Sequence, residues 1–176
     1  MKKKPWVLLV LLAGAGVLTA CGYHNPNVYK GPSKSIYMTE WKNRTSELGL
    51  DSQIYRSLTR WFQNTEAITT VRQKEGADLI LAGEIISLEL PSLAYGENSV
   101  TTQVKVLLRV RYILKDIATN KIVLEVASEL WTEQYLVSKN ISANLDNEKK
   151  ALNTIIEDLS RRIYQRTINE IPRMPQ

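Results

Sequence analysis

The chain has 176 residues, of which 44% are hydrophobic and 23% charged, with a formal net charge of +5 and a single cysteine. A chain of this length and composition can form one ordinary globular domain with its own core. The single cysteine excludes an intramolecular disulfide and a cysteine-rich metal centre.

The first 21 residues have the layout of a bacterial secretory signal. Basic residues at positions 2–4 precede an apolar run from Trp6 to Leu18, and Leu18-Thr19-Ala20-Cys21 closes this run. A leucine, two small residues and a cysteine form the lipobox of bacterial lipoproteins. This resemblance implies that residues 1–20 are removed as a lipoprotein signal peptide and that Cys21 is the lipid attachment site, acylated on its thiol and its new amine. An ordinary cleaved signal or a short membrane helix is the alternative, but the run is shorter than the ~20 apolar residues that a bilayer requires.

The segment after the signal predicts a short tether. Residues 21–35 are polar and contain Gly22, Pro26, Gly31 and Pro32, which disfavour regular structure. The tether would set the distance between the membrane and the domain. Gly22, rather than an aspartate, follows the anchor, and by resemblance to enterobacterial sorting this implies the outer membrane. Loss of the three lysines with the signal lowers the formal charge to about +2, which does not favour nucleic-acid binding.

Residues 36–171 predict a single α+β domain. Alternating side chains predict a first strand over 35–41, and the apolar positions from Leu50 to Phe62 recur at helical spacing, with a helix end near Asn64. A short strand at 68–72 and a strongly apolar strand at 79–90 follow, with a bulge or kink expected at Gly83. Residues 92–99 are polar and predict a loop.

The clearest strand covers 100–115. Its expected core face consists of Val104, Val106, Leu108, Val110, Tyr112 and Leu114. Its other face carries the basic ladder, which we define as Lys105, Arg109, Arg111 and Lys115. A loop at 118–120, with Asn120 in the left-handed conformation, connects it to a strand over 121–135. There we expect Ile122, Leu124, Val126 and Leu130 on the core face, and Glu125, Glu129, Trp131, Glu133 and Tyr135 on the other.

The register of this hairpin gives the basic ladder two competing interpretations. If Ile117 pairs with Lys121, Arg109 faces Glu129 and Lys105 faces Glu133. Each such pair would stabilise the sheet by about 0.2–1 kcal/mol, so the ladder could be a self-neutralised, solvated face. Arg111 faces Ala127 in this register and would have no partner, which favours anion binding instead. The sequence leaves both interpretations open.

The C-terminal region predicts a second helix. Residues 138–144 are polar, and Asp146-Asn147-Glu148 is expected to open the helix because acidic residues favour a helix N-terminus. Its core stripe is Leu152, Ile155, Ile156, Leu159, Ile163 and Ile168. The sequence contains no catalytic motif, and its only histidine, His24, lies in the tether. We therefore expect no enzyme activity, no metal and no cofactor.

The order of elements behind an N-terminal lipid resembles the LptE family of lipopolysaccharide-assembly lipoproteins. Further matches are Cys21-Gly22-Tyr23-His24 at the anchor, Thr45 before the first helix, residues 76–85, and residues 146–148. The resemblance implies an α+β fold in which two helices pack on one face of a mainly four-stranded mixed/antiparallel β-sheet. It also implies an outer-membrane, periplasm-facing lipoprotein that binds an LptD-type β-barrel and assists lipopolysaccharide insertion.

The same resemblance suggests where lipopolysaccharide is contacted. In the family, basic residues at the sheet end and in the loop before the last helix are linked to this contact. The matching residues are Arg109 and Arg111 in the strand and Lys139 in the loop, with Lys105 and Lys115 as further candidates. The alternative is a lipid-anchored periplasmic protein that activates peptidoglycan synthesis. Such proteins often have a longer tether, and the short one here favours a membrane-embedded partner.

Overall fold

A computed structural model describes residues 33–64, 68–95 and 101–173. The signal peptide and most of the proposed tether lie outside the described residues, and β1 begins at Lys34, near the end of that tether. Within the part of the chain that the structure describes, no helix combines the length and apolarity needed to cross a membrane.

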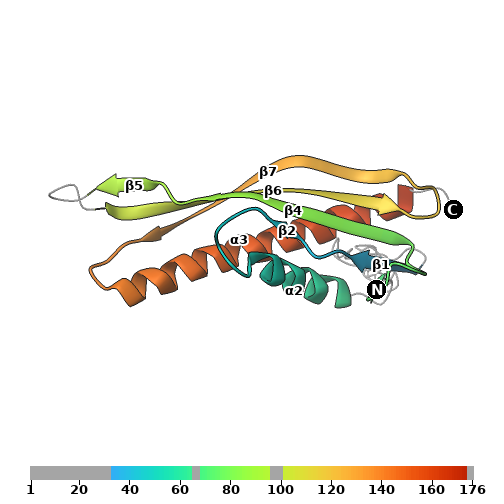
Figure 1. The fold of residues 1–176 in the computed structure, drawn as a ribbon, viewed down its shortest axis with the longest axis horizontal. Coiled ribbons are helices and arrows are strands. Elements are labelled where there is room, and N and C mark those ends of the chain that lie inside the picture. Colours follow the sequence, from blue (N-terminus) through green and yellow to red (C-terminus); the bar gives the residue numbers. More distant parts are fainter. Residues whose placement is uncertain (1–32, 65–67, 96–100, 174–176) are drawn as a thin grey trace, which may run out of the picture.

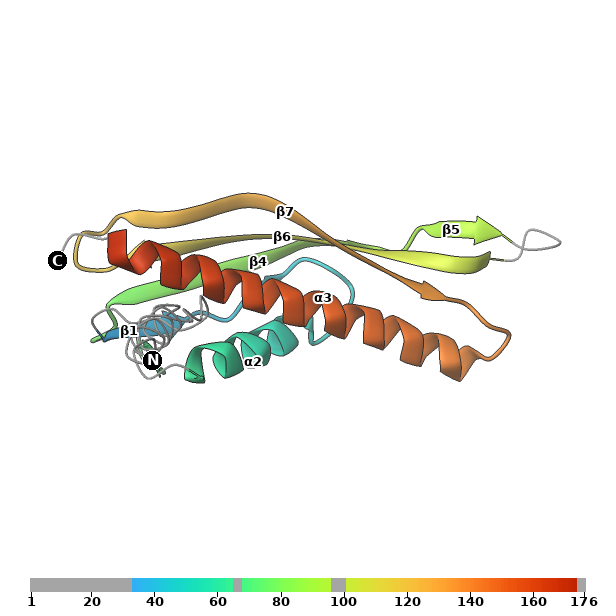
Figure 2. The ribbon, with the colours of Figure 1, turned by 180° about the vertical axis from the view of Figure 1, so that it is seen from behind.

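Two helices, α2 (Leu50–Gln63) and α3 (Ile141–Glu170), lie on one face of a mixed β-sheet, as Figures 1 and 2 show from opposite sides. The predicted α+β fold is confirmed, although the sheet has seven strands rather than mainly four. A short 3₁₀ turn, η2 (Ile171–Arg173), follows α3. Among the described residues, no helix lies on the opposite face of the sheet, which we call the outer face (Figure 1).

The sheet combines a short parallel part with a long antiparallel part. β1 (Lys34–Met38) pairs in parallel with β3 (Ile68–Val71) and with β4 (Leu79–Glu89). β6 (Thr101–Asp116) is antiparallel to β4 on one side and to β7 (Ile122–Leu136) on the other. β2 (Lys42–Asn43) pairs with β4 beyond β1, and β5 (Ser92–Tyr95) pairs with the start of β6. β5 replaces part of the loop predicted at 92–99.

The core lies between the helices and the inner face of the sheet, where the periodic patterns placed it. All six residues predicted for the inner face of β6 are buried, and so are all six of the α3 stripe. Leu50, Ile54, Leu58 and Phe62 of α2 are fully buried. Trp61 is only partly buried: its ring lies 5.7 Å from that of Tyr164 and its Nε1 donates to Glu157 Oε1 at 2.8 Å.

The irregularity predicted at Gly83 lies instead at Ile86, where the β4–β6 register shifts between Ile85 and Ser87. Gly83 has a different role. A Cβ added at this position would lie 2.4 Å from the ring of Trp41, so the indole packs directly against the glycine backbone. The shift in alternation around Gly83 therefore reflects this close approach rather than a bulge.

The predicted hairpin register holds only from Tyr112 to Leu114. Next to the turn it shifts between Leu114 and Lys115, so that Lys115 pairs with Ile122, and Ile122, predicted in the core, is 50% exposed. Asn120 adopts the left-handed conformation with φ 57°, as predicted, and Tyr112 pairs with Val126 as the Ile117–Lys121 register requires. The register then shifts between Val110 and Tyr112. Two residues of β7, Ala127 and Ser128, oppose Arg111 alone, which is the arrangement of a β-bulge.

The bulge exchanges the faces of the far half of β7, because one extra residue reverses the alternation of side chains. Leu130 was predicted in the core and is 45% exposed. Trp131 and Tyr135 were predicted on the outer face and instead pack against the core. Glu129 also lies on the helix side, where it accepts hydrogen bonds from Tyr112 and Arg166.

Helix α3 begins at Ile141, five residues before the predicted start at Asp146. Asn140 provides the N-cap, its Oδ1 accepting a hydrogen bond from the Ala143 N–H at 3.2 Å. The acidic residues that marked the predicted start lie in the second turn. The polar residues at 138–144 therefore include the N-cap and the first turn of α3.

Candidate functional site

The basic ladder lies on the outer face of β6, opposite the helices. Its four members alternate with the buried residues of the strand, so the predicted faces of β6 are confirmed. Lys139, the fifth candidate, is exposed in the turn between β7 and α3, outside the strand that carries the ladder. The structure thus brings together the ladder residues and leaves Lys139 apart from them.

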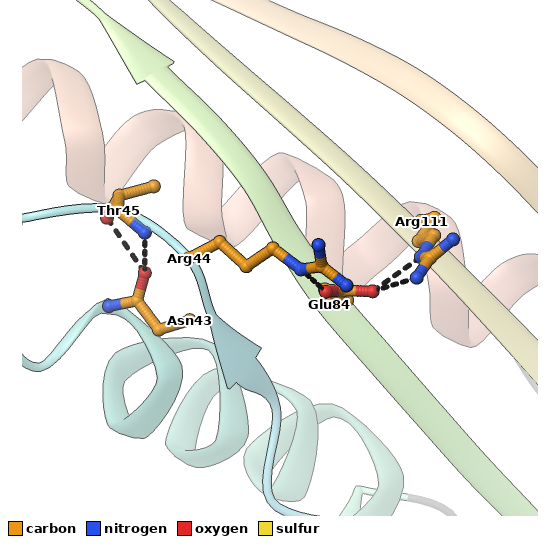
Figure 3. A network of polar contacts seen from close by, with 5 residues as sticks. All are labelled: Asn43, Arg44, Thr45, Glu84 and Arg111. Atoms are coloured by element: carbon orange, nitrogen blue, oxygen red, sulfur yellow. Dashed lines mark hydrogen bonds and ion pairs between the residues drawn. The ribbon is translucent and has the colours of Figure 1, made fainter.

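Arg111 belongs to a cluster of charges that crosses three segments of the chain (Figure 3). Glu84, on β4, is the register partner of Arg111 on β6. Glu84 Oε2 accepts a 2.5 Å hydrogen bond from Arg111 Nε and also forms an ion pair with Arg111 Nη2. Glu84 Oε1 accepts a hydrogen bond from Arg44 Nε. One carboxylate therefore holds two guanidinium groups.

The carboxylate of this cluster is buried, whereas its cations are not. The Glu84 side chain is 9% exposed, and the side chains of Arg44 and Arg111 are 51% and 52% exposed. Burial raises the pKa of the Glu84 carboxyl, but the hydrogen bonds and charges of Arg111 and Arg44 outweigh burial and lower this pKa below its usual value. Glu84 is held ionised beneath two half-exposed arginines.

The predicted pairs Arg109–Glu129 and Lys105–Glu133 are wrong, because the bulge shifts the register. Arg109 faces Leu130 and Lys105 faces Gln134. Among the described residues, Arg109 forms no ion pair and only a long 3.4 Å hydrogen bond to Ser128 Oγ. The expected roles are therefore exchanged: Arg111 is paired and Arg109 is not.

A shallow hollow of about 430 Å³ adjoins the cluster on the outer face. Ala82 and Ala127 are small residues in its lining, and Gly83 contributes backbone, because its missing Cβ would point toward Trp41 in the core. Lys42, Glu84, Arg111 and Glu125 contribute charged groups to its lining, and Ile113 contributes an apolar one. Its volume falls within the ~300–1,000 Å³ of small-ligand sites, and it combines a partly apolar surface with donors for an anion.

Sequence reasoning missed Arg44 and Glu84. The signal for Glu84 was present, since an acidic residue in the middle of a strongly apolar strand requires a cationic partner. Arg44 gave no such signal, because it follows a two-residue strand whose pairing is visible only in the structure. Within the described ranges, no group of three histidine, cysteine, aspartate or glutamate side chains could hold a metal ion.

Comparisons with known proteins agree with this fold. A family model described as LptE, lipopolysaccharide-assembly, matches residues 33–167. Hypothetical protein CT253 from Chlamydia trachomatis is similar at a TM-score of 0.56 and 15% identity, covering 81% of this chain and 100% of that chain.

Two lipoproteins of known structure are also similar. Uncharacterized lipoprotein B from Nitrosomonas europaea has a TM-score of 0.55 and 17% identity, covering 81% of this chain and 86% of that chain. Rare lipoprotein B from Shewanella oneidensis has a TM-score of 0.56 and 12% identity, covering 74% and 95%. At these identities the likeness establishes the fold alone. No curated protein matches the chain.

Proposed function

The chain belongs to the LptE family of lipopolysaccharide-assembly proteins, and from this membership we propose that it is an outer-membrane lipoprotein that binds an LptD-type β-barrel and assists insertion of lipopolysaccharide. The match over residues 33–167 carries the proposal, because it spans almost all of the described domain. The protein would act by binding rather than by catalysis. Its anchor would be the acylated Cys21, with the domain facing the periplasm.

The outer face of the sheet, which no described helix covers, supports a contact with lipopolysaccharide. Lipopolysaccharide presents clustered phosphates, and arginine offers them a planar set of donors that stays protonated. Arg109 and Arg111 are the main candidates on this face. Lys105, Lys115 and Lys139 are weaker candidates because an ammonium group cannot form the bidentate contact.

A pull-down of the full-length lipoprotein from detergent-solubilised outer membranes tests the partner assignment. We expect an LptD-type barrel to co-purify, and a peptidoglycan synthase serves as the competing prey. A matched pull-down with an unrelated lipoprotein of the same cell controls for co-solubilised lipid. Recovery of the synthase without a barrel would contradict the proposal and support a role in cell-wall synthesis.

A further inference from the structure

We propose that Arg44 and Arg111 together form a phosphate-binding site on the outer face of the sheet, and that Glu84 positions their guanidinium groups. This inference rests on the proposed function, since it names residues on the same face that would recognise a phosphate group. It adds Arg44, which lies outside the basic ladder and follows β2.

The two guanidinium groups have unused donors. A guanidinium carries five N–H groups. Arg44 donates to Glu84 through Nε, and Arg111 donates through Nε and Nη2. No other acceptor for these side chains is present among the described residues, and both side chains are about half exposed. The remaining N–H groups are therefore available to a ligand that approaches from the solvent side.

The position of Arg44 is fixed from the backbone. Its N–H donates to the Ile85 carbonyl at 3.1 Å, which attaches the segment after β2 to β4. On either side of Arg44, Asn43 Oδ1 accepts from the Thr45 N–H at 2.9 Å and from Thr45 Oγ1 at 2.8 Å (Figure 3). A site assembled before the ligand arrives loses less conformational entropy on binding, which favours affinity.

The charge of the site fits a phosphate group. Two guanidinium groups face one carboxylate, and Lys42 lies opposite Glu84 in the β2–β4 register. Glu125, which also lines the hollow, offsets one of these charges, so the three cations and two carboxylates leave an excess of one positive charge. The adjoining hollow has Ile113 and Ala127 in its lining, so a phosphate on the arginines could leave an attached apolar or sugar group in the hollow. The ligand class is therefore a phosphorylated amphiphile, which could be lipid A or a phospholipid.

If the Arg44–Glu84–Arg111 cluster had only a structural role, a different result would be expected. If the carboxylate only joins β2, β4 and β6, loss of Arg44 would lower stability without changing preference among ligands. The test therefore measures a ratio of affinities: that for bisphosphorylated lipid A divided by that for the same lipid with its phosphates removed. This ratio cancels contributions from the acyl chains.

The experiment uses the full-length lipoprotein in a nonionic detergent and compares Arg44→Gln, Arg111→Gln and Arg109→Gln. We expect Arg44→Gln to lower the ratio about tenfold, as loss of a charge-assisted hydrogen bond would. Arg60→Gln is the matched control, because Arg60 is also an exposed, ion-paired arginine but bonds Glu157 on the helix side. Arg44→Lys keeps the charge and should lower the ratio less, which provides a second variant if Arg44→Gln unfolds.

The outcomes separate this inference from the proposed function. An unchanged ratio in both Arg44 variants, with a lowered ratio in Arg109→Gln or Arg111→Gln, would overturn the Arg44 site and leave the lipopolysaccharide contact in place. A wild-type protein without preference for the phosphorylated lipid would overturn both. Inorganic phosphate and phosphatidylglycerol micelles are then tested separately as competitors. If either one competes less well with Arg44→Gln than with the wild type, the result would support the site and assign its ligand to the source that competes.

Discussion

A second polar network is buried on the helix side of the sheet, around Tyr112. This side chain is 2% exposed, and its hydroxyl donates to Glu129 Oε2 at 3.1 Å. Arg166 of α3 donates to Glu129 Oε2 at 2.9 Å and also contacts the tyrosine hydroxyl. Burial, together with the Glu129 charge, raises the pKa of Tyr112 to about 12 despite the opposing effect of Arg166.

This raised pKa predicts a loss of stability at high pH. The unfolded tyrosine ionises near 10.0, whereas the folded one keeps its proton to about 12. The native state therefore binds the proton more tightly, and this contribution is complete below pH 10 and is lost as the pH rises to about 12. A difference of about two pKa units corresponds to roughly 2–3 kcal/mol in the free energy of unfolding.

Urea unfolding from about pH 9 to about pH 12 measures this effect. Tyr112→Phe should remove most of the decline, and Tyr37→Phe, at a partly exposed position on β1, should leave it unchanged. Equal declines in the wild type and Tyr112→Phe would show that another group causes the alkaline loss of stability. The comparison between variants corrects for titration of the lysines, which all of them share.

For the helices and strands, the sequence predicted which side chains are buried wherever burial recurs at a regular spacing. The alternation from Val104 to Leu114 predicted the faces of β6, and the apolar spacing of α2 and α3 predicted the residues that face the sheet. These predictions succeed because burial of one face acts on every second residue of a strand and on every third or fourth residue of a helix.

The register of β7 could not be predicted in the same way. The bulge at Ala127 and Ser128 turns Glu129 toward Arg166, which lies on a helix that the chain reaches only later. A local pattern does not contain this tertiary contact. The Arg44–Glu84–Arg111 cluster depended similarly on the pairing of β2 with β4, between segments about 40 residues apart.

Val110→Asp tests the assignment of the β6 faces. Val110 is fully buried and lies opposite Glu129 in the register, so an aspartate there would bury a charge beside a carboxylate. We expect a loss of about 3–5 kcal/mol in the free energy of unfolding, measured by chemical denaturation. Leu107→Asp on the outer face of the same strand should cost far less, because its charge can reach water. Comparable losses in both variants would contradict the assignment.

The shape of the whole molecule suggests how the domain is held near the membrane. The molecule is elongated, and the helices cover one face of the sheet (Figures 1 and 2). The basic ladder lies on the other face, because its members alternate with the buried residues of β6. The described chain enters the sheet at β1, so the proposed tether would join an edge region of the sheet to the membrane rather than emerge from its centre. A lipid at Cys21 would keep the domain close to the bilayer.

The proposed lipid anchor at Cys21 can be tested directly. Each buried acyl CH₂ contributes about 0.8 kcal/mol to membrane binding, and stable attachment requires more than one chain, which a diacylated and N-acylated cysteine would supply. Mass spectrometry of the membrane-extracted protein should therefore show a mature N-terminus at a lipidated Cys21. Cys21→Ser should leave the membrane fraction, and Tyr23→Ser, a nearby change that preserves the cysteine, should remain there. An unmodified thiol at Cys21 in the membrane-bound protein would refute the anchor and require another means of membrane attachment.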